Sequence, residues 1–394
     1  MKPRSFLFLA VISALLAATA PLKSARRPRY GGTLRVEIGA EIFSLDPATT
    51  AANTEEAAAK EQIDALIYDH RNSEGTFAGA AGSGPFRIAA WEPGKRVVLA
   101  ANDDYRGGRP FLDSVEIQMA RPPRDRILDL ALGKADFAEI PPEQARRASE
   151  SGVRTTASQP DELLALVFLP GHPATSMEND ARAREALART VDRAAIVNFL
   201  LQKEGEPAGG LLPQWSGGTA FLFSTAADPA GAKELASQMA ATSKIVLGYD
   251  SADGLEQTVA QRVAVDAGES GILVSLAPQA VPGDAPANSS ASPTSLDAML
   301  IRWRMPSPKP RDALVNFLRA FGPLAGLDQV PLPGSASPEQ SYASERALVA
   351  SYRVIPLVWL PQVYGLSARV RDWKAPGAGE GWPLADVWLD GDAP

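Results

Sequence analysis

The sequence predicts an α/β protein with mixed sheets, because strand patterns and helix patterns alternate along most of the chain. Over residues 32–38, apolar side chains alternate with polar ones, as in a strand buried on one face. Residues 163–169 are all apolar, which is typical of a strand buried on both faces. Residues 124–132 have the apolar spacing of a helix, and Gly133 stands where a left-handed C-cap belongs.

The same patterns place the other elements in order. Further strands are expected at 86–90, 97–101, 115–119, 244–249, 272–276, 296–303 and 355–364. Further helices are expected at 54–68, 180–189, 193–202, 255–268 and 311–321. Asp192 is placed to cap the helix that follows it, and Val191 can pack on Ile196 across that cap.

Two segments are expected to be loops. Residues 279–296 consist largely of Ala, Pro, Ser, Gly and Asn, and residues 322–341 form a second loop-rich stretch. The high counts of proline and glycine, 33 and 32, agree with many connections of this kind.

Composition excludes several classes of protein. The net charge of −7 argues against a nucleic-acid partner, which usually shows a concentrated basic face. The chain has no cysteine, which excludes disulfides, thiolate metal sites, a cysteine nucleophile and a lipoprotein anchor. It has only two histidines, His70 and His172, too few for a histidine-rich metal site. We therefore expect no metal and no cofactor.

The N-terminus has the order of a secretory signal. Lys2 and Arg4 precede an almost wholly apolar run, residues 6–18, and small residues follow up to Ala20. The run is shorter than the roughly 20 residues that span a bilayer. We expect a signal peptide at 1–20; Pro21 leaves the cleavage site open, and retention as an anchor is the alternative. Export places the protein in a periplasm or outside the cell.

Common catalytic motifs are missing. The sequence contains no G-x-S-x-G, no H-E-x-x-H and no G-x-x-x-x-G-K pattern. Adjacent carboxylates such as Asp103 and Asp104 point in different directions on a regular element, which is unsuited to paired acid and base catalysis. The sequence therefore favours a protein that is not an enzyme, with a periplasmic hydrolase as the remote alternative.

Several segments together resemble family 5 of the extracellular solute-binding proteins, the dipeptide, oligopeptide and nickel receptors of ABC importers. The run Gly-Ser-Gly-Pro-Phe-Arg-Ile at 82–88 and Trp-Glu-Pro-Gly-Lys at 91–95 resemble the start of its central block. The stretch N-x-x-Y-x-G-G-x-P at 102–110, the A-L-G turn at 131–136 and the Asp-Arg helix pair at 182–196 continue it in family order. Each motif alone is ordinary turn or cap chemistry, whereas their joint order and spacing are specific.

The resemblance implies two α/β lobes joined by a hinge, with a solute bound between them. It implies a first part of lobe I at 26–165, lobe II at 166–352 and a return to lobe I at 353–394. It also implies a monomeric receptor that delivers a peptide or similar small solute to the permease of an ABC importer. A receptor-derived sensor or scaffold that has lost transport binding is the alternative.

The chain departs from the family in its first lobe. Only 34 residues separate Pro47 from Gly82, whereas family members carry an extra subdomain in this interval. We expect a shortened N-terminal lobe, which leaves either a more open cleft or a pocket that other groups close.

The second departure concerns the expected ligand site. The segment around Arg302, Trp303 and Arg304 resembles the family's G-W-x-x-D pocket strand, but Pro306 stands where many peptide receptors place an aspartate. In a strand, Trp303 points away from the face that the two arginines share. Arginines that face the cleft would favour an anionic solute; alternatively, they pair with acids while Trp303 packs in the core. Trp215 is a further candidate ligand contact.

Overall fold

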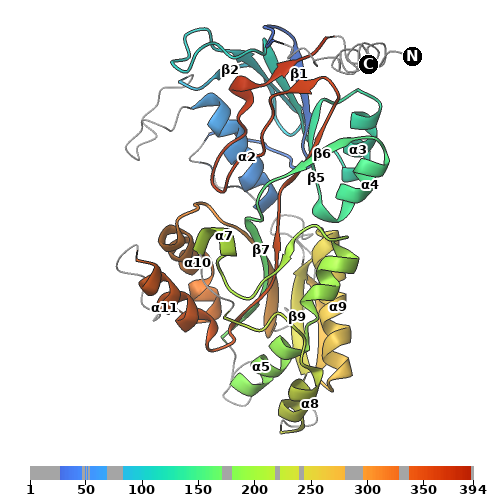
Figure 1. Cartoon of the computed structure of the whole chain (residues 1–394), viewed down its shortest axis with the longest axis vertical. Coiled ribbons are helices and arrows are strands. Elements are labelled where there is room, and N and C mark those ends of the chain that lie inside the picture. The colour runs from blue at the N-terminus through green and yellow to red at the C-terminus, as the bar shows by residue number, and fades with distance from the viewer. Residues whose placement is uncertain are drawn as a thin grey trace, which may run out of the picture.

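The computed structural model describes residues 27–46, 49, 51, 54–68, 83–170, 180–217, 222–238, 244–279, 296–327 and 337–391. These residues form two lobes, each built on its own mixed sheet, and the lobes lie one above the other in Figure 1. The structure confirms the expected α/β class with mixed sheets. The proposed signal peptide at 1–20, both histidines and most of the 279–296 loop lie outside the described residues.

The helices and strands have the following bounds. The first sheet contains β1 (Thr33–Glu37), β2 (Phe86–Glu92), β3 (Arg96–Ala101), β4 (Ser114–Gln118), β5 (Phe137–Ile140), β6 (Arg154–Ala157) and β13 (Val363–Leu366). The second contains β7 (Glu162–Phe168), β8 (Glu206–Pro207), β9 (Lys244–Asp250), β10 (Leu273–Gln279), β11 (Ala298–Arg304) and β12 (Val354–Leu360). The strands β14 (Val370–Arg371) and β15 (Trp388–Leu389) form a separate pair. The helices are α2 (Thr54–Ile67), α3 (Pro123–Ala131), α4 (Ala145–Glu150), α5 (Ala181–Thr190), α6 (Arg193–Ala195), α7 (Gln214–Gly217), α8 (Pro229–Ser237), α9 (Gly254–Glu269), α10 (Pro310–Ala325) and α11 (Pro338–Val349).

The sheet of the first lobe has the strand order β2-β3-β4-β1-β5-β13-β6 within the described residues. Strand β1 runs parallel to both β4 and β5, and β13 runs antiparallel to β5 and β6. Apolar side chains of α2 pack on one face of this sheet, and those of α3 and α4 pack in a separate cluster with β5 and β13. The C-terminal strand β13 therefore completes a lobe that the N-terminal strands begin.

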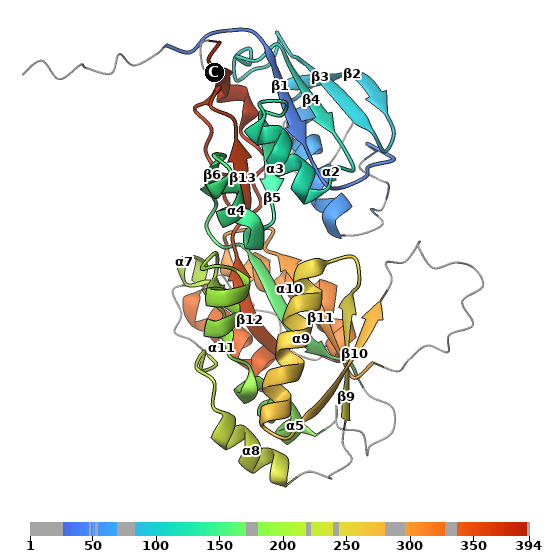
Figure 2. The same cartoon turned by 90° about the vertical axis from the view of Figure 1, so that its right-hand side faces the viewer.

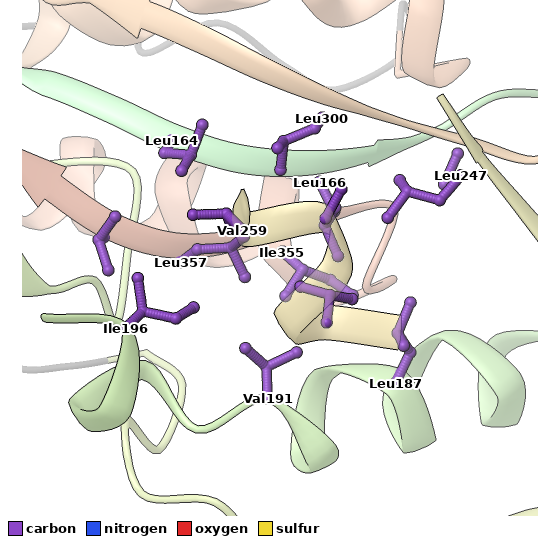
Figure 3. Close-up of a cluster of buried hydrophobic side chains, with 14 of the residues drawn as sticks. Leu164, Leu166, Leu187, Val191, Ile196, Leu247, Val259, Leu300, Ile355 and Leu357 are labelled. Carbon is purple, nitrogen blue, oxygen red and sulfur yellow. The ribbon is translucent and has the colours of Figure 1, made fainter. Parts of the chain in front are cut away.

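The sheet of the second lobe has the order β10-β9-β11-β7-β12-β8. Strand β7 is buried along its whole length, as expected for an uninterrupted apolar run, and pairs antiparallel with β11 and β12. Helices α5 and α9 cover one face of the sheet, and α10 and α11 cover the other (Figure 2). Figure 3 shows the first of these cores, where Leu187 and Val191 meet Leu166 and Ile355.

Two short segments, residues 158–161 and 361–362, connect the lobes; we call them the crossing segments. They are held to each other by hydrogen bonds from Ser158 N to Gln362 O (2.9 Å) and from Asp161 N to Leu360 O (3.0 Å). The sequence places the lobe boundaries at 165/166 and 352/353. The change of sheet occurs before β7 and after β12 instead, because both strands belong wholly to the second sheet.

Two expected elements differ in the structure. The helix expected at 193–202 consists of α6 and a π-helix at Ile196–Leu200. The loop expected at 322–341 is helical at both ends, since α10 continues through Pro323 to Ala325 and α11 begins at Pro338; residues 328–336 lie outside the described residues. Proline is tolerated in the first turn of a helix, where its missing N–H has no intrahelical acceptor, so Pro338 starts a helix where its composition suggested a loop.

Arg193 is 1% exposed, although no acid is paired with it among the described residues. Its guanidinium donates to the carbonyl oxygens of Pro356 (2.8 Å), Ala188 (3.2 Å) and Val191 (3.4 Å). Burial lowers the pKa of Arg193 to about 10. The side chain thus joins the end of α5 to an irregular position of β12 through carbonyl oxygens of both segments.

The expected cap at Asp192 is confirmed, since its Oδ1 accepts from Ala195 N at 2.9 Å. We predict that Asp192→Ala lowers the free energy of unfolding by about 1 kcal/mol, because it leaves a helix N–H without an acceptor. Asp192→Asn, which keeps the acceptor, should stay close to the wild type. Urea denaturation measures both; equal losses in the two variants would contradict the capping role.

Candidate functional site

A pocket of about 240 Å³ lies between the lobes. Its walls come from α2 and residues 376–380 on one side, and from the end of β11 with the following Met305 and Pro306 on the other. Residues of the crossing segments, Asp161 and Gln362, complete it together with Tyr364 of β13. The pocket therefore contains parts of both lobes and of both connections between them.

Residues 376–380 close the pocket beside Pro306. Gly379 has φ +73°, and a Cβ at this position would lie 2.0 Å from the Pro306 carbonyl oxygen. Only a glycine lets the two backbones approach this closely. Pro306, where the family resemblance would put an aspartate, thus lies directly against the first lobe's C-terminal loop.

Trp303 lies on the wall of the pocket but is only 4% exposed. Its Nε1 donates to Asn316 Oδ1 (2.9 Å), and its ring meets Phe317 edge to face at 5.2 Å between centroids. Both partners belong to α10, on the face of the sheet opposite to the arginines. The core packing that the sequence left open as an alternative therefore accounts for most of the surface of Trp303.

Arg302 is committed to two acids. Its Nε contacts Glu162 Oε1 at 2.5 Å, and its Nη1 contacts Asp253 Oδ2 at 2.6 Å. The other oxygen of Asp253 caps α9 by accepting from Leu255 N and Glu256 N. Burial acts to lower the pKa of Arg302, but the two carboxylates outweigh it and raise the pKa above its ordinary value. Arg302 therefore stays protonated, and two carboxylates of the second lobe balance its positive charge.

Glu162 shows the other half of this pairing. Burial acts to raise its pKa, but Arg302 and Arg304 outweigh burial, so the pKa falls to about 2. Its Oε2 accepts from Gln362 Nε2 at 3.0 Å. Because both carboxylate oxygens have donors, the first residue of β7 remains charged in a buried position.

Arg304 differs from its neighbour. Its Nη2 donates to Gln362 Oε1, and no ion pair with a carboxylate forms among the described residues. Burial acts to lower the pKa of Arg304, but the field of Glu162, Glu139 and Asp161 raises it overall. Arg304 therefore remains positively charged at the pocket wall, where its guanidinium is hydrogen-bonded to the neutral amide of Gln362.

Three acids line the pocket, Glu61, Asp161 and Glu380. Asp161 is the buried one, at 5% exposure, whereas Glu61 and Glu380 are exposed. Gln362 Nε2 lies 3.4 Å from its Oδ1, at the long end of hydrogen bonding. Burial raises the pKa of Asp161 to about 6, and the nearby Arg304 only partly opposes this. A carboxylate and a guanidinium of opposite charge therefore stand on either side of Gln362 without forming an ion pair with each other.

Trp215 lies outside the pocket wall. Its Nε1 donates to Pro160 O at 2.8 Å, so α7 is attached to a crossing segment. Of the residues that the sequence singled out, the structure brings Arg302, Trp303 and Arg304 to the pocket and places Trp215 beside the connection between the lobes.

The sequence reasoning missed Asp161 and Gln362. Asp161 lies just before the apolar run at 163–169, and Gln362 lies inside the strand expected at 355–364, so each reads as an ordinary polar residue of a strand or its terminus. One signal was available: each lies close to an expected lobe crossing, where the resemblance puts the solute. Gln362 is 58 residues from Arg304 and 200 residues from Glu162, so these contacts depend on the pairing of distant strands, which periodicity does not reveal.

Comparison with curated proteins gives partial matches. The oligopeptide-binding protein AppA of Bacillus subtilis is 31% identical over 127 residues, which is 32% of this chain and 23% of AppA. The probable D,D-dipeptide-binding periplasmic protein DdpA of Escherichia coli is 28% identical over 135 residues, 34% of this chain and 26% of DdpA. The matched segments thus span about a quarter of these relatives.

Comparison with solved structures covers more of the fold. The chain resembles the periplasmic binding protein DppA of Helicobacter pylori, solved with the peptide STSA, with a TM-score of 0.68 and 13% identity over 92% of this chain and 99% of that one. It resembles the oligopeptide-binding protein AppA of Bacillus subtilis, solved with a nonapeptide, with a TM-score of 0.57 and 17% identity over 78% of this chain and 67% of AppA. The fold is therefore that of two-lobed binding proteins, in a form shorter than AppA.

The family profile described as "Bacterial extracellular solute-binding proteins, family 5 Middle" matches residues 32–323, well over half of the chain. This match covers parts of both lobes, the first crossing segment and the strand that carries Arg304, and ends before β12 and β13. The chain belongs to family 5 of the bacterial extracellular solute-binding proteins.

Proposed function

We propose that the protein is an exported receptor that binds a small peptide-like solute between its lobes and delivers it to an ABC importer. The observation that carries this proposal is the interlobe pocket, in which Arg304 stands charged without a carboxylate partner among the described residues. The relatives named for oligopeptide or dipeptide binding and the two-lobed fold support the same class of function. A receptor role accounts for the pocket without any catalytic step.

The charges of the pocket define what the solute must offer. A solute carboxylate can accept a charge-assisted hydrogen bond from the guanidinium of Arg304. A solute ammonium can donate a hydrogen bond to the carboxylate of Asp161, because a buried carboxylate is stabilised by a cationic partner. Trp303, Met305 and Tyr364 give the wall an apolar part. The pocket therefore suits a short zwitterion with a modest apolar side chain.

Closure and export belong to the same proposal. The two crossing segments are short, so the lobes can rotate about them, and a solute stabilises the closed form by its higher affinity for that form. No helix among the described residues is long and apolar enough to span a membrane. With the signal-like N-terminus, we propose a monomeric periplasmic protein whose partner is the importer's permease.

We predict that substitutions of Arg302 and Arg304 have different effects in a thermal-shift screen with pools of dipeptides, amino acids and other carboxylates. A solute that binds only the native state raises the melting temperature. Arg304→Met should strongly reduce the shift, because the carboxylate loses its cation. Arg302→Met should instead lower the free energy of unfolding by about 3–5 kcal/mol, because Glu162 and Asp253 lose their partner.

The screen also tests the proposal as a whole. No shift of the wild type with any pool would favour a sensor or scaffold, and turnover of a chromogenic ester or peptide would favour a hydrolase. An unchanged shift in Arg304→Met would remove Arg304 from the site.

We predict that binding of dipeptides with a free amino group weakens as the pH falls below about 6. Asp161 is protonated in the free protein below its pKa of about 6, so an ammonium must displace that proton. The apparent dissociation constant should rise up to about tenfold per pH unit between pH 6 and 5. Asp161→Asn should bind weakly with little pH dependence over this range. Titration calorimetry at several pH values checks this; identical profiles of wild type and variant would contradict an ammonium site at Asp161.

A further inference from the structure

We propose that Gln362 is the positioning residue of the pocket: its amide holds the Arg304 guanidinium toward the solute without neutralising it. This inference rests on the proposed function and adds a residue that neither the sequence motifs nor the family match single out. It concerns how the cation is kept available for binding.

The side chain of Gln362 is in contact with charged groups at both ends. Its Oε1 accepts from Arg304 Nη2. Its Nε2 donates to Glu162 Oε2 at 3.0 Å and lies 3.4 Å from Asp161 Oδ1. One planar amide therefore separates a guanidinium from two carboxylates, with an acceptor facing the cation and donors facing the anions.

These neighbours permit only one orientation of the amide. If the amide rotated by 180°, its NH₂ group would face the guanidinium, and its oxygen would face the carboxylates. Both contacts would be repulsive in a half-buried site. The arrangement of charges therefore orients Gln362, and Gln362 in turn orients Arg304.

The backbone of Gln362 is also held in place. Its N–H donates to Ser158 Oγ at 2.9 Å, and its carbonyl accepts from Ser158 N at 2.9 Å. These bonds join the two crossing segments side by side. The amide that holds Arg304 is thus anchored to the connection between the lobes and not to a mobile surface chain.

A neutral amide is the chemistry that this position requires. A glutamate would pair with Arg304 and occupy the charge that a solute carboxylate needs, and it would stand beside Glu162 and Asp161. An apolar side chain would leave Arg304 without an acceptor, free to turn toward Asp161. Glutamine fixes the guanidinium and leaves its charge available.

The experiment compares binding of a mixed dipeptide pool with binding of the same pool carrying C-terminal amides. The ratio of the two affinities reports the carboxylate interaction with Arg304. Wild type should prefer the free acids, and Arg304→Met should lose that preference. Gln362→Glu and Gln362→Met should each reduce the preference by about tenfold, with little effect on the amidated pool. Gln261→Met, an exposed substitution on α9, is the matched control and should behave as wild type.

A double-mutant comparison separates positioning from general damage. In the Arg304→Met background, Gln362→Met should cause no further loss of acid preference, because the group that Gln362 positions is gone. Equal loss for acids and amides in Gln362→Met, or a loss that adds fully to that of Arg304→Met, would overturn the inference. Failure of wild type to bind either pool would instead reject the proposed function, so the two failures are distinguishable.

Discussion

Glu162 begins a strand that is buried along its whole length, and a carboxylate in that position must be paired or protonated. Arg302 supplies the pairing and at the same time reaches Asp253, which caps α9. One arginine thereby connects a central strand, its neighbour β11 and the start of a helix. Removing a partner would leave a buried charge, so this cluster fixes the end of β11 relative to the crossing segments. The pocket depends on it, since Arg304 lies two residues further along the same strand.

The two arginines show how neighbouring residues of one type can have different roles. They share a face of β11, but only Arg302 meets acids that can neutralise it. Arg304 meets an amide instead and keeps its charge available. The difference follows from which residues the crossing segments place opposite the strand. The first lobe adds a second consequence: its loop at 376–380 lies against Pro306 through Gly379, at the position where the family resemblance would put an aspartate.

Much of the fold could be predicted from local patterns. Strand β7, helix α5 with the cap at Asp192 after it, and the alternation in β1 follow from periodicity and cap chemistry, which are properties of short segments. The predictions failed where composition suggested a loop, as at Pro338, which starts a helix. Arg193 was also beyond local reasoning. An arginine after an aspartate reads as a surface cation, yet it is buried because carbonyls of α5 and β12 converge on it.

The sequence by itself determined the α/β class and the membership suggested by ordered motifs, and it singled out the segment 302–304, which lines the interlobe pocket. These depend on neighbours within a few turns or on motif order. The tertiary structure alone decided that Arg302 is neutralised, that Trp303 packs mainly against α10, and that Asp161 and Gln362 stand beside Arg304. The physical reason is that charge pairing in a cleft depends on distances between segments far apart in the chain. Strand pairing within the second sheet, and the crossing segments at its edge, set those distances.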